Sequence, residues 1–297
     1  MKVWLNGQFV DRDEAKVSVF DAGYQHGVGL FETMLARNGK VFRAERHMRR
    51  LADSAREMRL SERLRIEPLV DALQLVLNEN DQDSARVRLT LTGGDLNLLQ
   101  SKGQSASDPT ILIVAQPPTE YPDDFFEKGV VVMIAAGREN PLDPMAGHKT
   151  LNYWPRIQQL QLAASHGAGE AIWFTVSNHL AAGSVSNVFL VKDGALCTPF
   201  ARGEEESGAL ASTVMPGITR EAIIELADEM SIGTGRTMIS IEDVLEADEV
   251  FLTNSSWGVL PVTGVERESI GDGTPGEITK RLREGWLELI DRETKGI

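Results

Sequence analysis

The heptapeptide GHKTLNY, residues 147–153, joins two stretches of different hydrophobic periodicity. Before it, an apolar run rich in β-branched residues at 130–136 predicts a strand. After it, apolar residues recur at spacings of three and four from Tyr153 to Ala164, which predicts a helix. Lys149 therefore lies at a loop-to-helix junction beside a sheet, where an amine can be directed into a cleft and desolvated until it becomes a nucleophile. From the spacing alone, Lys149 is better interpreted as a solvated lysine. Other segments of the chain, described below, favour a functional role instead.

Composition and charge narrow the function classes. The chain has 297 residues, enough for one large or two ordinary domains. Its 42% hydrophobic and 25% charged residues are typical of globular proteins. A net charge of −14 argues against a nucleic-acid partner, because nucleic-acid phosphates would be repelled. The single cysteine, Cys197, excludes an internal disulfide framework and any multi-cysteine metal site.

Hydropathy predicts neither a membrane span nor a secretory signal. No uninterrupted apolar run approaches the ~18 residues that a membrane-spanning helix requires. The first residues turn at Asn6-Gly7, too early for the apolar core of a signal peptide. We therefore expect a cytoplasmic protein with no membrane partner.

The first part of the chain predicts strands with two helices. Asn6-Gly7 is a strong hairpin signal, and the polar, proline-rich run at 117–124 predicts a linker. Helical spacing places Arg50 on or beside an amphipathic helix, where most arginines are solvated but one could reach an anion. The predicted helices lie at 47–58 and 69–77, and the predicted strands at 2–10, 34–36, 86–92 and 111–115. We expect an N-terminal α/β domain at 1–116, a linker at 117–124 and a C-terminal domain at 125–297 that carries Lys149.

The second part combines strands with two polar turns. Pro216-Gly217 precedes a helical pattern, and a helix start presents free N–H groups that can hold a phosphate. Taken alone, this pattern is better explained by an ordinary helix start. A hydroxyl-rich turn at 253–258 follows a short apolar strand. Further strands are predicted at 171–174, 188–191, 195–197 and 259–262.

An activated lysine, two hydroxyl- and glycine-rich turns and an arginine near a helix suit a phosphorylated aldehyde cofactor. In this order, from Val3 to about Val262, the segments resemble the fold-type IV pyridoxal-phosphate enzymes. That family includes branched-chain and D-amino-acid aminotransferases and aminodeoxychorismate lyase. The resemblance implies an α/β (α+β, two-domain) fold of the D-amino-acid aminotransferase type with the cofactor cleft between the domains. It also implies pyridoxal 5'-phosphate as cofactor and a homodimer.

The resemblance assigns roles to individual residues. Lys149 is implied to form the Schiff base and to shuttle the proton, and Tyr153 to lie near the cofactor's phenolic oxygen. The groups implied to bind the cofactor phosphate are Arg50, the N–H groups of Ile218 and Thr219, the Thr219 hydroxyl and Ser255. On the substrate side the resemblance points to Glu32 and Arg88, and Thr33 is a candidate acid for a lyase. No metal is expected.

The sequence departs from the family pattern at two positions. Ala182 stands where relatives place the glutamate that pairs with the pyridine nitrogen, which weakens the expected electron sink. Another acid from 204–206 could replace it, although that run is best interpreted as a solvated loop; alternatively the reaction needs a weaker sink. Val28 replaces an aspartate within a Gly-x-Gly, a change that concerns packing.

Three functions follow. The leading prediction is an aminotransferase that exchanges an amino group between an amino acid and a 2-keto acid. The alternative is a lyase of the aminodeoxychorismate type that releases pyruvate, because the 253–258 turn and the Phe31-Glu32-Thr33 run look more like that branch. The third is a cofactor-binding pseudoenzyme, favoured only by Ala182. Substrate identity and D or L stereochemistry do not follow from the sequence.

Overall fold

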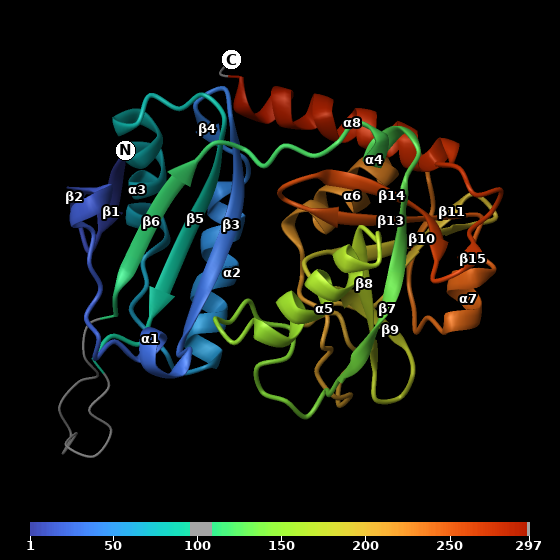
Figure 1. The fold of residues 1–297 in the computed structure, drawn as a ribbon, viewed down its shortest axis with the longest axis horizontal. Helices are drawn as coiled ribbons and strands as arrows, with labels where there is room; N and C mark the ends of the chain where they lie inside the picture. The colour runs from blue at the N-terminus through green and yellow to red at the C-terminus, as the bar shows by residue number, and fades with distance from the viewer. Residues whose placement is uncertain (96–108, 296–297) are drawn as a thin grey trace. The chain divides into compact units, whose positions relative to one another are not determined.

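Short antiparallel strands and two amphipathic helices form the first part of the chain (Figure 1). A computed structural model describes residues 1–95 and 109–295. It divides into two units: Met1–Thr119, His148–Asn152 and Ile290–Ile297 form the first, and Glu120–Gly147 and Tyr153–Leu289 form the second. The change of unit after Thr119 falls inside the predicted linker, whereas His148–Asn152, including Lys149, belongs to the first unit. The predicted domain bounds stay a prediction.

The first unit contains a six-stranded sheet of order β2-β1-β6-β5-β3-β4, in which all paired strands are antiparallel. The hairpin predicted at Asn6-Gly7 is present, and both residues have positive φ, as such a turn requires. The elements are β1 (Lys2–Leu5), β2 (Gln8–Asp11), α1 (Ala22–His26), β3 (Gly29–Arg37), β4 (Lys40–Val41), α2 (Ala44–Glu57), α3 (Ile66–Glu79), β5 (Ala85–Thr92) and β6 (Ile111–Gln116), with a short 3-10 turn at Arg12–Glu14.

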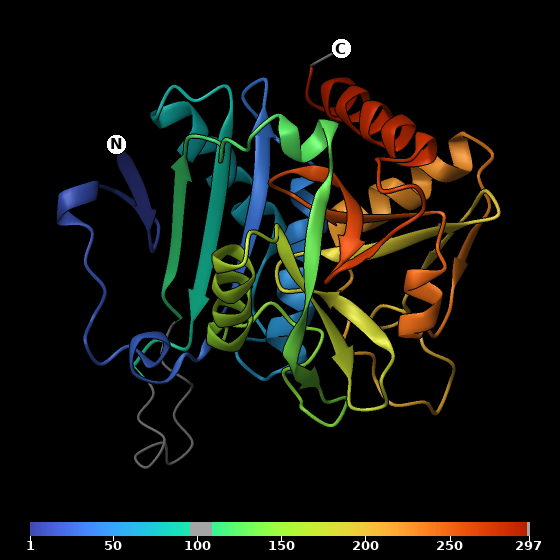
Figure 2. The same ribbon diagram turned by 45° about the vertical axis from the view of Figure 1, so that its right-hand side comes forward.

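Alternation along β3 and β5 gives this sheet two different faces. Leu30, Met34 and Ala36 of β3 are buried in one apolar core with Leu89 of β5 and Leu73 of α3. The helices α2 and α3 lie on that face of the sheet in both views (Figures 1 and 2). Because successive side chains point to opposite faces, Phe31 and Thr33 are directed away from the helices.

The second unit contains a nine-stranded mixed sheet. The strand order is β12-β11-β10-β13-β14-β7-β8-β9, and β15 pairs with β14. Its strands are β7 (Val130–Glu139), β8 (Glu170–Thr175), β9 (Leu180–Gly183), β10 (Asn187–Lys192), β11 (Ala195–Thr198), β12 (Thr234–Arg236), β13 (Glu249–Asn254), β14 (Gly258–Val265) and β15 (Glu268–Ser269). Its helices are α4 (Asp124–Glu127), α5 (Trp154–Ser165), α6 (Ile218–Glu229), α7 (Ile241–Leu245) and α8 (Glu277–Thr294), whose last residues group with the first unit.

The helices predicted after residues 153 and 217 are confirmed as α5 and α6. The sequence patterns did not predict β9, β12 and β15, each of four residues or fewer, because such short pieces carry too few residues to show a period. Among the described residues, no helix is both long and apolar enough to cross a bilayer.

Candidate functional site

Lys149 is held against β3 by its own backbone. The Phe31 N–H donates to the Lys149 carbonyl at 2.9 Å, and the Leu151 N–H donates to the Gly29 carbonyl at 3.0 Å. Leu30 and Thr150 form an antiparallel bridge between these two bonds. Residues 149–151 thus pair with the first residues of β3, and the position of Lys149 along the strand is fixed by hydrogen bonds.

This pairing also decides the direction of the Lys149 side chain. Thr150 lies opposite Leu30 and is buried, so the flanking residues Lys149 and Leu151 point to the other face of the sheet. The Lys149 Nζ accordingly lies 4.3 Å from the centre of the Phe31 ring. Lys149 is only half-buried, so its amine combines an apolar wall with access from outside the core.

Two of the three residues predicted on the substrate side share this face. Thr33 and Arg88 are direct partners across β3 and β5, so their side chains lie side by side on the helix-free face. The Arg88 guanidinium lies 3.9 Å from the centre of the same Phe31 ring that Lys149 contacts. Lys149 and Arg88 therefore place two cationic groups on one aromatic ring.

Glu32, the third predicted residue on the substrate side, lies on the opposite face of the sheet. It is 1% exposed, and its carboxylate accepts hydrogen bonds from Arg50 Nε at 2.8 Å and Arg50 Nη2 at 2.6 Å. His47 Nδ1 lies 2.8 Å from the same carboxylate. The structure thus brings Glu32 together with Arg50 on α2, which is itself predicted to bind the cofactor phosphate; both predicted roles stay predictions.

Burial and charge set the protonation of this cluster. Burial raises the pKa of Glu32, but the positive charge of Arg50 and the hydrogen bond from His47 outweigh it and lower the pKa to about 2. Burial lowers the pKa of His47 from its ordinary value of 6.5, despite the hydrogen bond to Glu32. Near pH 7 the cluster is therefore an ion pair of Glu32 and Arg50 with a neutral imidazole that donates its Nδ1 proton.

In the second unit, three segments meet around the turn at 184–187. Asn254, the last residue of β13 directly before the turn that contains Ser255, donates through Nδ2 to the Val185 carbonyl at 3.2 Å. Asn187 donates through Nδ2 to the Met215 carbonyl at 2.9 Å, just before α6. Tyr153, which precedes α5, donates its hydroxyl to the Ser184 carbonyl at 2.9 Å.

Four of the predicted cofactor-binding residues are therefore grouped in this unit. They come from three separate segments, and the shared neighbour of these segments is the 184–187 turn. The four residues are Tyr153, Ile218, Thr219 and Ser255.

The start of α6 lacks a side-chain cap. Its N-cap is Gly217, which has no side chain to accept a hydrogen bond from the first turn. The first N–H groups of a helix have no partner inside the helix and attract anions. A Cβ at Gly217 would clash with the Asn187 amide oxygen, so the chain keeps its backbone close to Asn187 here. Thr253, opposite Asn187 on β13, is 1% exposed, and its hydroxyl has no hydrogen-bond partner among the described residues.

Glu170 organises the 184–187 turn and was not identified from the sequence. Its buried carboxylate accepts from the N–H groups of Ser184 and Val185 and from the Ser186 hydroxyl, each at 3.2 Å. Burial raises the pKa of Glu170 to about 7, although these hydrogen bonds act in the opposite direction. A lone glutamate opening an apolar strand was the only sequence signal for this residue.

Ala182 is buried on β9 opposite Trp173. Its neighbour Gly183 accepts a hydrogen bond from Arg156 at 2.9 Å, and Arg156 also pairs with Glu139 at 2.7 Å. The methyl group of Ala182 itself offers nothing that a pyridine nitrogen could bind. Val28 precedes β3, and its carbonyl accepts from the Gly93 N–H at 3.1 Å, a local packing role.

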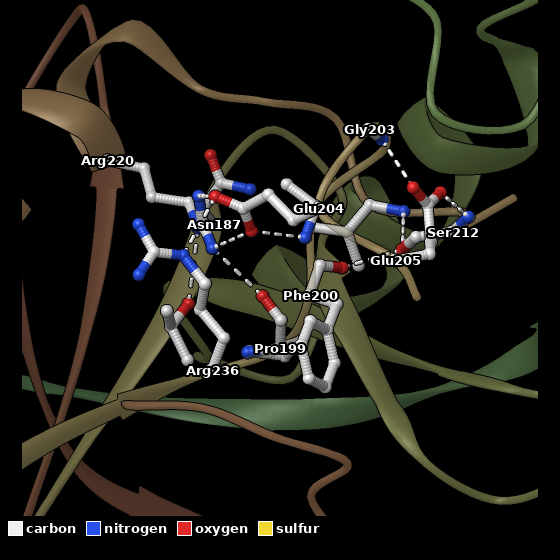
Figure 3. A network of polar contacts seen from close by, with 12 residues as sticks. Asn187, Pro199, Phe200, Gly203, Glu204, Glu205, Ser212, Arg220 and Arg236 are labelled. Carbon is white, nitrogen blue, oxygen red and sulfur yellow. Dashed lines mark hydrogen bonds and ion pairs between the residues drawn. The ribbon is translucent and has the colours of Figure 1, made fainter. Parts of the chain in front are cut away.

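The run at 204–206 is not the solvated loop that its composition indicates. Glu204 is paired with Arg220 at 2.7 Å and with Arg236 at 3.0 Å. Glu205 accepts from the N–H groups of Gly203 and Ser212 (Figure 3). Only Glu206 is exposed. Since the Glu204 and Glu205 carboxylates are already engaged, they are poor candidates to replace the missing glutamate.

The chain is similar in sequence to known aminotransferases. The model of the amino-transferase class IV family matches residues 29–265. The branched-chain-amino-acid aminotransferase of Escherichia coli K12 is 31% identical over 99% of this chain and 94% of its own. The D-alanine aminotransferase of Staphylococcus haemolyticus is 30% identical over 98% of both chains.

Solved structures of related enzymes also resemble this chain along nearly its whole length. A branched-chain amino acid aminotransferase from T.th., solved with pyridoxamine 5'-phosphate, superposes with a TM-score of 0.88 at 26% identity, covering 99% of this chain and 96% of the other. The 4-amino-4-deoxychorismate lyase of Pseudomonas aeruginosa gives a TM-score of 0.82 at 26% identity, covering 96% and 98%. The α/β fold of the D-amino-acid aminotransferase type, which the resemblance implies, is therefore confirmed.

The Glu32–Arg50 pair predicts a large stability effect. Replacing Glu32 by Gln leaves Arg50 facing a neutral group in a largely buried site, so we expect the free energy of unfolding to fall by about 3 kcal/mol. The exposed Glu45–Arg49 pair on the same helix provides the control, and Glu45→Gln should leave stability unchanged. Urea unfolding of both variants measures this, and equal effects would contradict the burial argument.

Glu170 predicts a pH dependence of stability. Its pKa is about 7 in the folded chain against an ordinary 4.5, so the folded state holds the proton more tightly. The stabilisation of the folded state that comes from this tighter proton binding is fully present below pH 4.5, and it is lost as pH rises through 7. Relative to Glu170→Gln, the wild-type chain should lose about 3 kcal/mol of unfolding free energy across this range. As a control, the exposed Glu62→Gln variant should differ from wild type in unfolding free energy by the same amount at every pH. A difference that is likewise independent of pH for Glu170→Gln would refute the prediction.

Proposed function

Because this chain belongs to the class IV aminotransferase family, we propose that it is a pyridoxal 5'-phosphate-dependent transaminase that moves an amino group between an amino acid and a 2-keto acid. The observation that carries the proposal is the placement of Lys149, whose amine is fixed beside Phe31 on the same face as Arg88. On this shared face, an amine could remove a proton from the α-carbon of a substrate whose carboxylate the guanidinium binds.

The residues present suit this cofactor. In the second unit, the uncapped start of α6 and the buried, unsatisfied Thr253 hydroxyl offer hydrogen-bond capacity to an anion such as a phosphate. Within this unit we assign the phosphate to Ile218, Thr219 and Ser255, and the role of Arg50 in the first unit stays a prediction from the resemblance. When bound, the cofactor supplies the electron sink that stabilises negative charge at the α-carbon.

Each remaining role is assigned to a residue of this chain. Lys149 would hold the cofactor covalently and, when released from it, accept and return the α-proton. Arg88 would bind the substrate carboxylate, and Phe31 would keep water from the amine. Glu32 would position Arg50, since its carboxylate fixes the plane of that guanidinium.

A lyase that releases pyruvate is the second candidate. Thr33 favours it, because this hydroxyl lies beside Arg88 on the face that Lys149 occupies, where a lyase needs an acid for the leaving group. The lyase of Pseudomonas aeruginosa shares the fold. A cofactor-binding pseudoenzyme is the third and weakest candidate, since Lys149 is present and held in place. The homodimer and the cytoplasmic location stay predictions.

Reduction with borohydride tests the role of Lys149. The purified chain with pyridoxal 5'-phosphate should absorb in the visible region, and borohydride should bleach that band and leave a label on the peptide containing Lys149. Lys149→Ala should lose the band, whereas Lys128→Ala, at an exposed position, should keep it. A wild-type chain that stays colourless with added cofactor would remove the enzyme proposal.

Dependence on a keto acid separates the two reactions. A transaminase without an acceptor stops after one equivalent of product per site, because the amino group stays on the cofactor. A lyase continues to release pyruvate without any acceptor. We expect the first outcome with a panel of D- and L-amino acids. Sustained pyruvate release from 4-amino-4-deoxychorismate would instead establish the lyase, and Thr33→Val would then lower its rate.

A further inference from the structure

Arg220, the third residue of α6, is held in place by an acidic loop. Its side chain is 3% exposed, and Nη1 and Nη2 donate to the two Glu204 oxygens at 2.9 and 2.7 Å (Figure 3). Nη2 also donates to the Pro199 carbonyl at 3.1 Å. Two parallel bonds from one guanidinium to one carboxylate fix both position and orientation.

Glu204 is in turn anchored on its other side. Its Oε2 accepts from the Ala201 N–H at 2.8 Å, and its Oε1 accepts from Arg236 Nε at 3.0 Å. Burial raises the pKa of Glu204, but the hydrogen bonds from Arg220, Ala201 and Arg236 lower it to about 2. The carboxylate is therefore negatively charged throughout the neutral range and balances the positive charge of Arg220.

The first turn of α6 has a second anchor. Asn187 binds the Met215 carbonyl, and its amide oxygen lies so close to Gly217 that a Cβ there would clash. Asn187 thus fixes the chain just before the helix, and Arg220 fixes it just after Thr219. The N–H groups of Ile218 and Thr219 lie between the two anchors.

We propose that Glu204 is a positioning residue for phosphate binding: through its paired hydrogen bonds to Arg220 it sets the direction of the Ile218 and Thr219 N–H groups. The inference rests on the proposed function, since it assigns those groups to the cofactor phosphate. Like Glu32 at Arg50, Glu204 occupies two guanidinium donors of the arginine that it holds.

The test compares two ligands that differ only in the phosphate. Dissociation constants of pyridoxal 5'-phosphate and of pyridoxal are measured by absorbance for the full chain, for Glu204→Gln and for Glu206→Gln. Glu206 is exposed in the same loop and serves as the matched control. In Glu204→Gln we expect phosphate-ligand affinity to fall about 10- to 100-fold, with pyridoxal affinity changed less than about 2-fold. Glu206→Gln should match wild type for both ligands.

The outcomes distinguish the inference from the proposed function. An equal loss for both ligands in Glu204→Gln, or no loss for either, would overturn the positioning role. A wild-type chain that binds pyridoxal as tightly as the phosphorylated form would instead overturn the proposed phosphate site.

Arg220→Lys provides a second route if Glu204→Gln does not fold. It keeps the charge but loses the paired geometry, so we expect the same selective loss, smaller in size. An unchanged ratio of the two affinities in Arg220→Lys would likewise overturn the inference.

Discussion

The pairing of residues 149–151 with the start of β3 is the constraint on which the proposed chemistry depends. Two backbone hydrogen bonds and one bridge tie a segment far along the chain to the first strands. Backbone bonds do not involve the side chains that must react, so they can fix Lys149 without engaging its amine. The buried neighbour Thr150 then forces Lys149 to the helix-free face of the sheet.

The two units fix their functional groups by different means. In the first, strand pairing directs Lys149 and Arg88 onto one ring, and the buried Glu32–Arg50 pair lies on the opposite face. In the second, side chains bind backbone: Tyr153, Asn187 and Glu170 each hold a peptide group of a turn. Groups that are held by strand pairing or by hydrogen bonds to the backbone need little reorganisation when a ligand binds, so they are already arranged for binding.

Local signals predicted much of the fold, and long-range pairing accounts for what they missed. The Asn6-Gly7 hairpin and the helix after Gly217 follow from turn and capping chemistry within a few residues. The partners of Glu204 could not be predicted, because Arg220 and Arg236 approach it only in the folded chain. For Glu32 a signal did exist: it is adjacent to Thr33 in a strand, and neighbouring strand residues point to opposite faces of the sheet.

Successive side chains at 149–151 point to opposite faces of the sheet, so the direction of the Lys149 side chain depends more on the length of this segment than on its composition. The hydrogen bonds to β3 use only main-chain atoms, so the pairing itself does not depend on which side chains the segment carries. Inserting one residue between Lys149 and Thr150 while the 150–151 pairing is kept would move the lysine one position away from its paired neighbours, and its amine would turn toward the helices. Such a chain would retain its cores and the groups proposed to bind the phosphate, yet its lysine amine would no longer lie beside Phe31. Homologous chains should therefore vary in sequence here while keeping the spacing between the lysine and its paired residues constant.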